Sequence, residues 1–138
     1  MRRAVTIDGS SATIGAMAYT YSVESARRLI RIQLSPQLTR DEIHAMVNEL
    51  NADPRVAPDF VELIDCSDLI PVADVGADRI RAMATGSLAR VSRRAFVAPQ
   101  PAIFGTCRMF AAFFEMANRG ESIAVFKTTR EAEEWLGV

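Results

Sequence analysis

Two short stretches near the start of the chain alternate apolar and polar residues with the period of a β-strand. The first is 19–23 and the second is 29–34, in which Ile30, Ile32 and Leu34 share one face. Only a short polar turn separates the two stretches. The pattern therefore predicts an antiparallel hairpin.

Helical and strand-like patterns then alternate to the end of the chain. Thr39 and Glu42 have the spacing of a capping box, and Asp53-Pro54 ends the first helix. Further strands are expected at 60–66, 95–98 and 123–126, and further helices from Asp74 to about Val91, at 102–118 and at 128–136. A second capping box, Thr128 and Glu131, should open the last helix, which should bury Trp135 and Leu136.

This order of elements predicts an α/β fold. The stretch 60–66 is almost continuously apolar, which is typical of a parallel strand covered on both faces. The later alternation of strands and helices predicts parallel neighbours. We expect a mixed five-stranded sheet, an N-terminal antiparallel hairpin followed by parallel strands, with about four helices. Residues 17–138 should form one domain, and residues 1–16 a flexible extension or an edge strand at Ala4–Ile7.

The charge balance narrows the class of partner. Sixteen basic and 17 acidic residues leave no positive field that would draw the chain onto nucleic acid. No apolar run approaches the length of a membrane span, and no signal sequence is evident, so a soluble cytoplasmic protein is expected. Cys66 and Cys107 are interpreted as buried free thiols, with a disulfide or redox pair as the alternative.

Most catalytic templates are absent from the sequence. It contains no G-x-S-x-G, P-loop, G-x-G-x-x-G or H-E-x-x-H motif, and its single histidine, His44, falls on the polar face of the first helix. We therefore predict no enzyme activity, no catalytic residues, no metal and no cofactor. Asp65, Asp68 and Asp74 form an alternative carboxylate site, although aspartates at such junctions usually form turns and N-caps.

The helix expected at 102–118 is more apolar than one sheet face can cover. Its surplus needs a neighbouring helix, a second subunit, a membrane surface or an apolar ligand as cover. Flexible methionines and large aromatics suit an adaptable binding surface. The predicted binding residues are Phe104, Met109, Phe110, Phe113, Phe114 and Met116.

The segment 61–76 carries a resemblance to a known family. It resembles STAS domains, in which a strand ends in an Asp-x-Ser-Gly-like turn and a second motif with a phosphoserine opens the next helix. Asp65 and Ser67 match the first turn, and Asp68 replaces its glycine. The second motif keeps only Gly76, with Val75 in the phosphoacceptor position.

Together with the closing segment 123–136, these residues are similar to the bacterial SpoIIAA-like group of STAS/SEC14 domain-containing proteins. The resemblance implies a non-enzymatic regulatory domain that binds protein partners, lipid-like apolar molecules or a membrane surface. Because Val75 cannot be phosphorylated, it does not imply a kinase-operated switch. The favoured function is apolar binding through the helix at 102–118. The first alternative is a protein–protein regulator that uses a turn made of Asp65, Ser67, Asp68, Asp74, Val75 and Gly76, and the second is a small enzyme with strand-end carboxylates.

Overall fold

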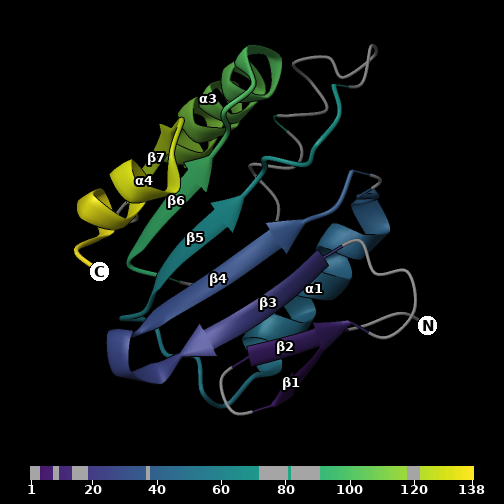
Figure 1. Cartoon of the computed structure of the whole chain (residues 1–138), viewed down its shortest axis with the longest axis vertical. Coiled ribbons are helices and arrows are strands. Elements are labelled where there is room, and N and C mark those ends of the chain that lie inside the picture. The colour runs from purple at the N-terminus through teal and green to yellow at the C-terminus, as the bar shows by residue number, and fades with distance from the viewer. Residues whose placement is uncertain are drawn as a thin grey trace.

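The computed structural model describes residues 4–7, 10–13, 19–36, 38–71, 81, 91–117 and 122–138. Within these residues one sheet carries helices on both faces (Figure 1). The elements are β1 (Ala4–Ile7), β2 (Ser10–Thr13), β3 (Tyr19–Glu24), the 3₁₀ turn η1 (Ser25–Arg27), β4 (Leu29–Leu34), α1 (Arg40–Ala52), β5 (Val61–Asp65), β6 (Arg93–Val97), α3 (Pro101–Ala117), β7 (Ser122–Phe126) and α4 (Thr129–Leu136).

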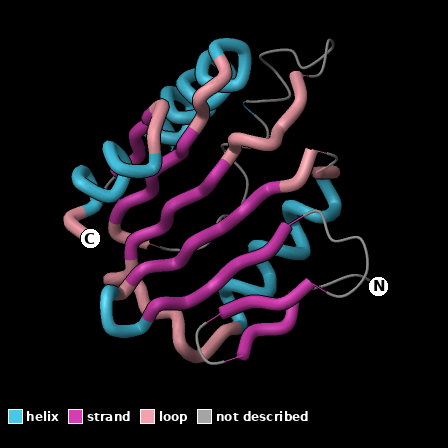
Figure 2. Tube along the Cα trace, in the orientation of Figure 1, coloured by secondary structure: helices cyan, strands magenta, loops and turns pink. Residues whose placement is uncertain are grey.

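The main sheet has five strands in the order β3-β4-β5-β6-β7 (Figure 2). Strands β3 and β4 pair antiparallel, whereas β4, β5, β6 and β7 pair parallel. The predicted mixed sheet is confirmed. The hairpin turns through η1, and Arg28 adopts a left-handed conformation with φ 51° directly before β4.

The alternating residues at the N-terminus form strand β1, which pairs antiparallel with β2 in a two-stranded sheet of its own. This small sheet lies beside β3 (Figure 1). No strand was expected at β2, because Ser10–Thr13 has no alternation of apolar and polar residues. The domain boundary near residue 17 stays a prediction.

The helices divide between the two faces of the sheet. Buried residues of α1 and α3 pack in one core with Ile30, Ile32 and Ile64, whereas α4 packs on the other face against Leu63 and Val97. Three of the expected helices are therefore present in the described residues. The second expected helix lies outside them, apart from Arg81 and Val91.

Local signals set the ends of these helices as expected. Thr39 and Glu42 form both halves of the capping box on α1. At α4 only one half of the predicted second capping box is present: the Thr128 hydroxyl accepts a hydrogen bond from the Glu131 backbone N–H. The helix ends at Gly137 with φ 80°. On α4, Leu136 is buried against the sheet, and Trp135 is half-buried and packs against Phe126 with ring centroids 5.7 Å apart.

A charged pair is buried at the centre of the sheet. Glu62 of β5 and Arg94 of β6 occupy paired positions and are 3% and 2% exposed. The Arg94 Nε donates a 2.7 Å hydrogen bond to Glu62 Oε1, and the guanidinium lies 5.1 Å from the ring centroid of Phe114. A strand covered on both faces must bury its charged residue too, so this glutamate needs its arginine.

Removing one member of this pair should destabilise the fold strongly. We expect Glu62→Leu or Arg94→Leu each to lower the free energy of unfolding by about 3–5 kcal/mol, because the remaining charge is left buried. The double variant should lose clearly less than the sum of the single losses. Urea unfolding followed by circular dichroism measures all three, and strictly additive losses would contradict a coupled pair.

Candidate functional site

The turn after β5 is organised by short-range hydrogen bonds. Asp65 Oδ1 accepts from the Ser67 backbone N–H at 2.8 Å and also from the Ser67 hydroxyl. The Gln33 side-chain amide donates to Asp68 at 3.2 Å, and the Gln100 side chain donates to the Ser67 carbonyl at 3.5 Å. Asp65 is thus a turn former, the structural role that the sequence favoured.

The remaining residues of the predicted regulatory turn are Asp74, Val75 and Gly76. They lie outside the described residues, so the structure does not place them beside Asp65, Ser67 and Asp68.

A hollow of about 200 Å³ adjoins this turn on the sheet face that carries α4. Its floor comes from the hairpin strands and β5, and one wall is the first residue of α4, Thr129. The lining residues are Thr20, Tyr21, Ser22, Arg31, Ile32, Gln33, Leu63, Asp65 and Thr129. The carboxyl ends of parallel strands are where open α/β sheets hold ligands. We call the turn 65–68 together with this hollow the strand-end site; its volume suits a small polar group.

Sequence patterning did not identify this hollow. The polar residues of the hairpin were expected to face away from the core, but nothing in their spacing shows that α4 covers only part of that face. The alternation along a strand predicts which of its faces is polar, but it does not predict which helix packs on that face or how much of it the helix covers.

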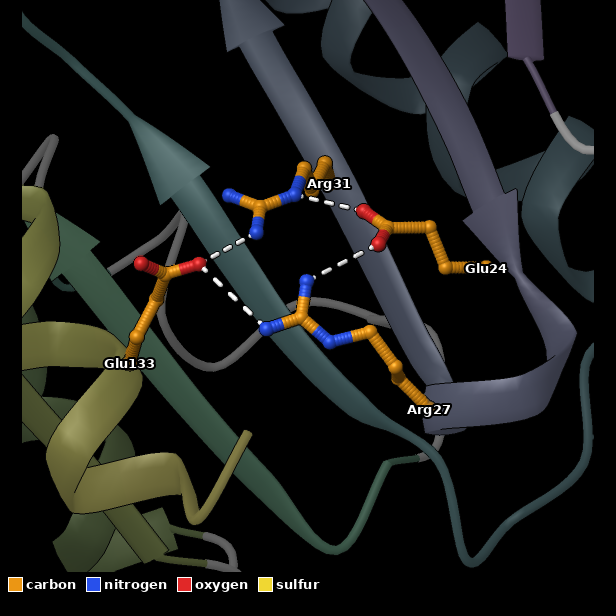
Figure 3. A network of polar contacts seen from close by, with 4 residues as sticks. All are labelled: Glu24, Arg27, Arg31 and Glu133. Carbon is orange, nitrogen blue, oxygen red and sulfur yellow. Dashed lines mark hydrogen bonds and ion pairs between the residues drawn. The ribbon is translucent and has the colours of Figure 1, made fainter.

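Four charged side chains tie α4 to the hairpin (Figure 3). Arg31 donates to both Glu24 and Glu133, and Arg27 approaches Glu24 at 3.1 Å and Glu133 at 3.8 Å. Burial alone would raise the pKa of Glu24, but hydrogen bonds from Arg31 and Arg27 outweigh that effect, so the pKa of its carboxyl is lowered. The network therefore stabilises the fold in the state in which Glu24 is ionised.

This lowered pKa predicts an acid-dependent loss of stability. The contribution of Glu24 is present above its unfolded pKa of about 4.3 and is lost as the pH falls through its lower folded pKa. We expect Glu24→Gln to cost up to about 1 kcal/mol at pH 7 and to flatten the fall in stability below pH ~5. Asp53→Asn should flatten the fall independently, because the pKa of Asp53 is lowered mainly by Arg55, and the effects of the two substitutions should add. Unfolding curves of parent and Glu24→Gln that stay parallel across this pH range would contradict the prediction.

The phenylalanines predicted to bind through α3 mostly face their own domain. Phe114 is fully buried under the Arg94 guanidinium, and Phe110 stacks on it and meets Phe96 edge-on, with centroids 6.3 and 5.4 Å apart. Phe113 and Phe104 are half-buried, and their rings lie under the cationic ends of Arg81 and Lys127. The core and its rim thus take up much of the apolar surplus of α3.

The two methionines of the predicted set behave differently. Met109 is 41% and Met116 78% exposed, and both point away from the sheet side of α3. Gly105 and Ala112 are exposed on the same side of the helix, and a Cβ built at Gly105 would meet nothing within 4 Å. We call Gly105, Met109, Ala112 and Met116 the outward stripe of α3.

The two cysteines are brought together in the core. Both are free and buried, Cys66 directly after β5 and Cys107 on the inner side of α3. A hydrogen bond between the two thiols, reinforced by burial, raises the pKa of Cys66, and the same hydrogen bond lowers the pKa of Cys107. The spacing of 41 residues gave no sign of this contact.

No group of three or more His, Cys, Asp or Glu side chains among the described residues could hold a metal ion. His44 is exposed on α1. In those same ranges no helix is long and apolar enough to cross a membrane.

Comparison with known proteins places this architecture. No family model matches the sequence, and no curated protein matches it. Among solved structures, the crystal structure of an uncharacterized DUF3478-family protein with a SpoIIAA-like fold, from Shewanella loihica PV-4, matches 91% of this chain and 98% of its own, with a TM-score of 0.58 and 17% identity. The fold is SpoIIAA-like. At this identity the similarity establishes the fold, and the expected resemblance to the SpoIIAA-like group is confirmed at that level.

Proposed function

We propose that this SpoIIAA-like chain is a non-enzymatic binding domain that contacts an apolar surface through the outward stripe of α3. The observation that carries the proposal is the exposure of Met109 and Met116, at 41% and 78%. Apolar side chains that gather on one exposed side of a helix are typical of an interaction surface. The mobile thioether side chains also suit a contact that must adapt to its partner.

The placement of the phenylalanines supports this narrower surface. Since Phe110 and Phe114 belong to the core, they fix the orientation of α3 and leave the stripe on a rigid support. Binding through such a surface needs no catalytic group.

The proposal predicts that charge on the stripe abolishes binding. We expect the parent protein to show a subunit complex or a retained apolar molecule by native mass spectrometry, or to float with phosphatidylcholine vesicles. Met109→Glu/Met116→Glu should lose that binding and keep its circular dichroism spectrum. Asn48→Glu/Asn51→Glu adds the same charge to the exposed polar face of α1 and should leave binding unchanged. A parent that is strictly monomeric, carries no ligand and ignores vesicles would rule the proposal out.

A second candidate function rests on the strand-end site. Ile70 is 59% exposed directly after the turn in which Asp65 and Asp68 are held. A large apolar side chain beside a polar turn is a suitable anchor for a protein partner, as expected of a regulator acting through this turn.

This second candidate predicts a partner that depends on the turn. A protein captured by the parent chain and identified by mass spectrometry should be lost with Asp68→Ala and with Ile70→Asp. It should be retained with Met116→Glu, which leaves the turn intact. If no captured protein responds to either turn substitution, the regulator model fails.

A further inference from the structure

The outward stripe has the spacing of a helix–helix seam. Its four residues follow one another at intervals of four, three and four, the alternation by which one helix contacts another in a coiled coil. The opposite side of α3 carries Ile103, Cys107, Phe110 and Phe114 at the same intervals and packs them into the core. Both sides of α3 therefore carry the spacing of a packing surface, and among the described residues the core covers the inner one.

The sizes of the stripe residues are complementary to one another. If a second α3 runs antiparallel across the stripe about a two-fold axis between residues 110 and 111, Gly105 faces the second copy's Met116. In the same arrangement Met109 faces the second copy's Ala112. Both small residues then oppose a methionine, the alternation of large and small that fills a seam without voids. The open space over Gly105 leaves room for the opposing side chain.

The charges beside the stripe fit the same arrangement. Arg108 and Glu115 are exposed and stand on one flank of it, seven residues apart. Neither has an ion-pair partner within the described residues. In a two-fold symmetric antiparallel pair, the same flank of each helix faces its counterpart on the other helix. Arg108 therefore lies beside the second copy's Glu115, and the symmetry forms this contact twice. A parallel pair would instead set Gly105 against Gly105 and methionine against methionine.

We propose that the outward stripe of α3 binds the same stripe of a second copy of this chain, antiparallel and two-fold symmetric, with Arg108 paired to Glu115 across the interface. This inference rests on the proposed function and names its partner. An anionic membrane is disfavoured as the occupant, because such surfaces attract helices rich in Lys and Arg, whereas this flank carries one charge of each sign. A seam of one 17-residue helix is about 25 Å long and smaller than a standard interface, so the dimer is weak, with a Kd on the order of micromolar.

A charge-swap experiment tests the pairing. By sedimentation velocity over a concentration series, the parent chain should dimerise, and Arg108→Glu or Glu115→Arg should each raise the Kd about tenfold or more, because each turns both symmetric pairs repulsive. The double variant Arg108→Glu/Glu115→Arg should restore most of the affinity. A double variant as weak as the single ones would overturn the pairing.

Cysteine crosslinking tests the direction of the helices. Under mild oxidation Gly105→Cys/Met116→Cys should form a covalent dimer, because residue 105 then faces residue 116 of the second copy. Within one helix these positions are about 16 Å apart and cannot be bridged. Gly105→Cys alone and Met116→Cys alone should not crosslink; if they do, the helices run parallel and the inference is wrong. The parent chain reports any contribution of Cys66 and Cys107.

The outcomes separate the two proposals. A chain that stays monomeric at all concentrations, yet binds vesicles or retains an apolar molecule through Met109 and Met116, overturns the dimer and leaves the proposed function standing. A chain that stays monomeric and binds neither vesicles nor an apolar molecule overturns both the dimer and the proposed function.

Discussion

The fold depends on covering both faces of its parallel strands, and the helices on the two faces differ in length: α1 and α3 pack on one face and the shorter α4 on the other. Strands β5 and β6 are buried on both sides, yet α4, which has eight residues, packs on one of those faces. Among the described residues α4 is the helix on that face, and because it is short, ion pairs as well as packing fix its position. Arg31 and Glu133 do this across 102 residues of sequence. The part of the face left beside α4 is polar, and there the hollow of the strand-end site forms.

The opposite face of the sheet is covered by longer helices, and a charged pair is buried beneath them. Two long helices, α1 and α3, share one core there, and the Glu62–Arg94 pair lies beneath Phe114. A buried ion pair adds little net stability but penalises any register that separates its members. It therefore suits the middle of a sheet in which the central positions of β5 and β6 beside the pair are apolar and do not fix the register by themselves.

The surplus of apolar residues on α3 divides into two parts with different consequences. The inner residues build the core, whereas the two methionines of the outward stripe are exposed. Sites that local rules of folding do not explain are where function is expected. The stripe is such a place, and the strand-end site, which the exposed Ile70 follows in the chain, is a second.

Much of the architecture was determined by the sequence alone, because the signals involved are local. The hairpin follows from alternation over six residues, the start of α1 from Thr39 and Glu42, and the end of α4 from Gly137. Each depends on neighbours within a few positions, where chain geometry leaves few choices. The tertiary structure decided the rest: the contact of Cys66 with Cys107, the pairing of Glu62 with Arg94, and which side chains of α3 face inward. These depend on the rotation of one element against another, and a pattern along one segment cannot express that rotation because it carries no information about the facing segment.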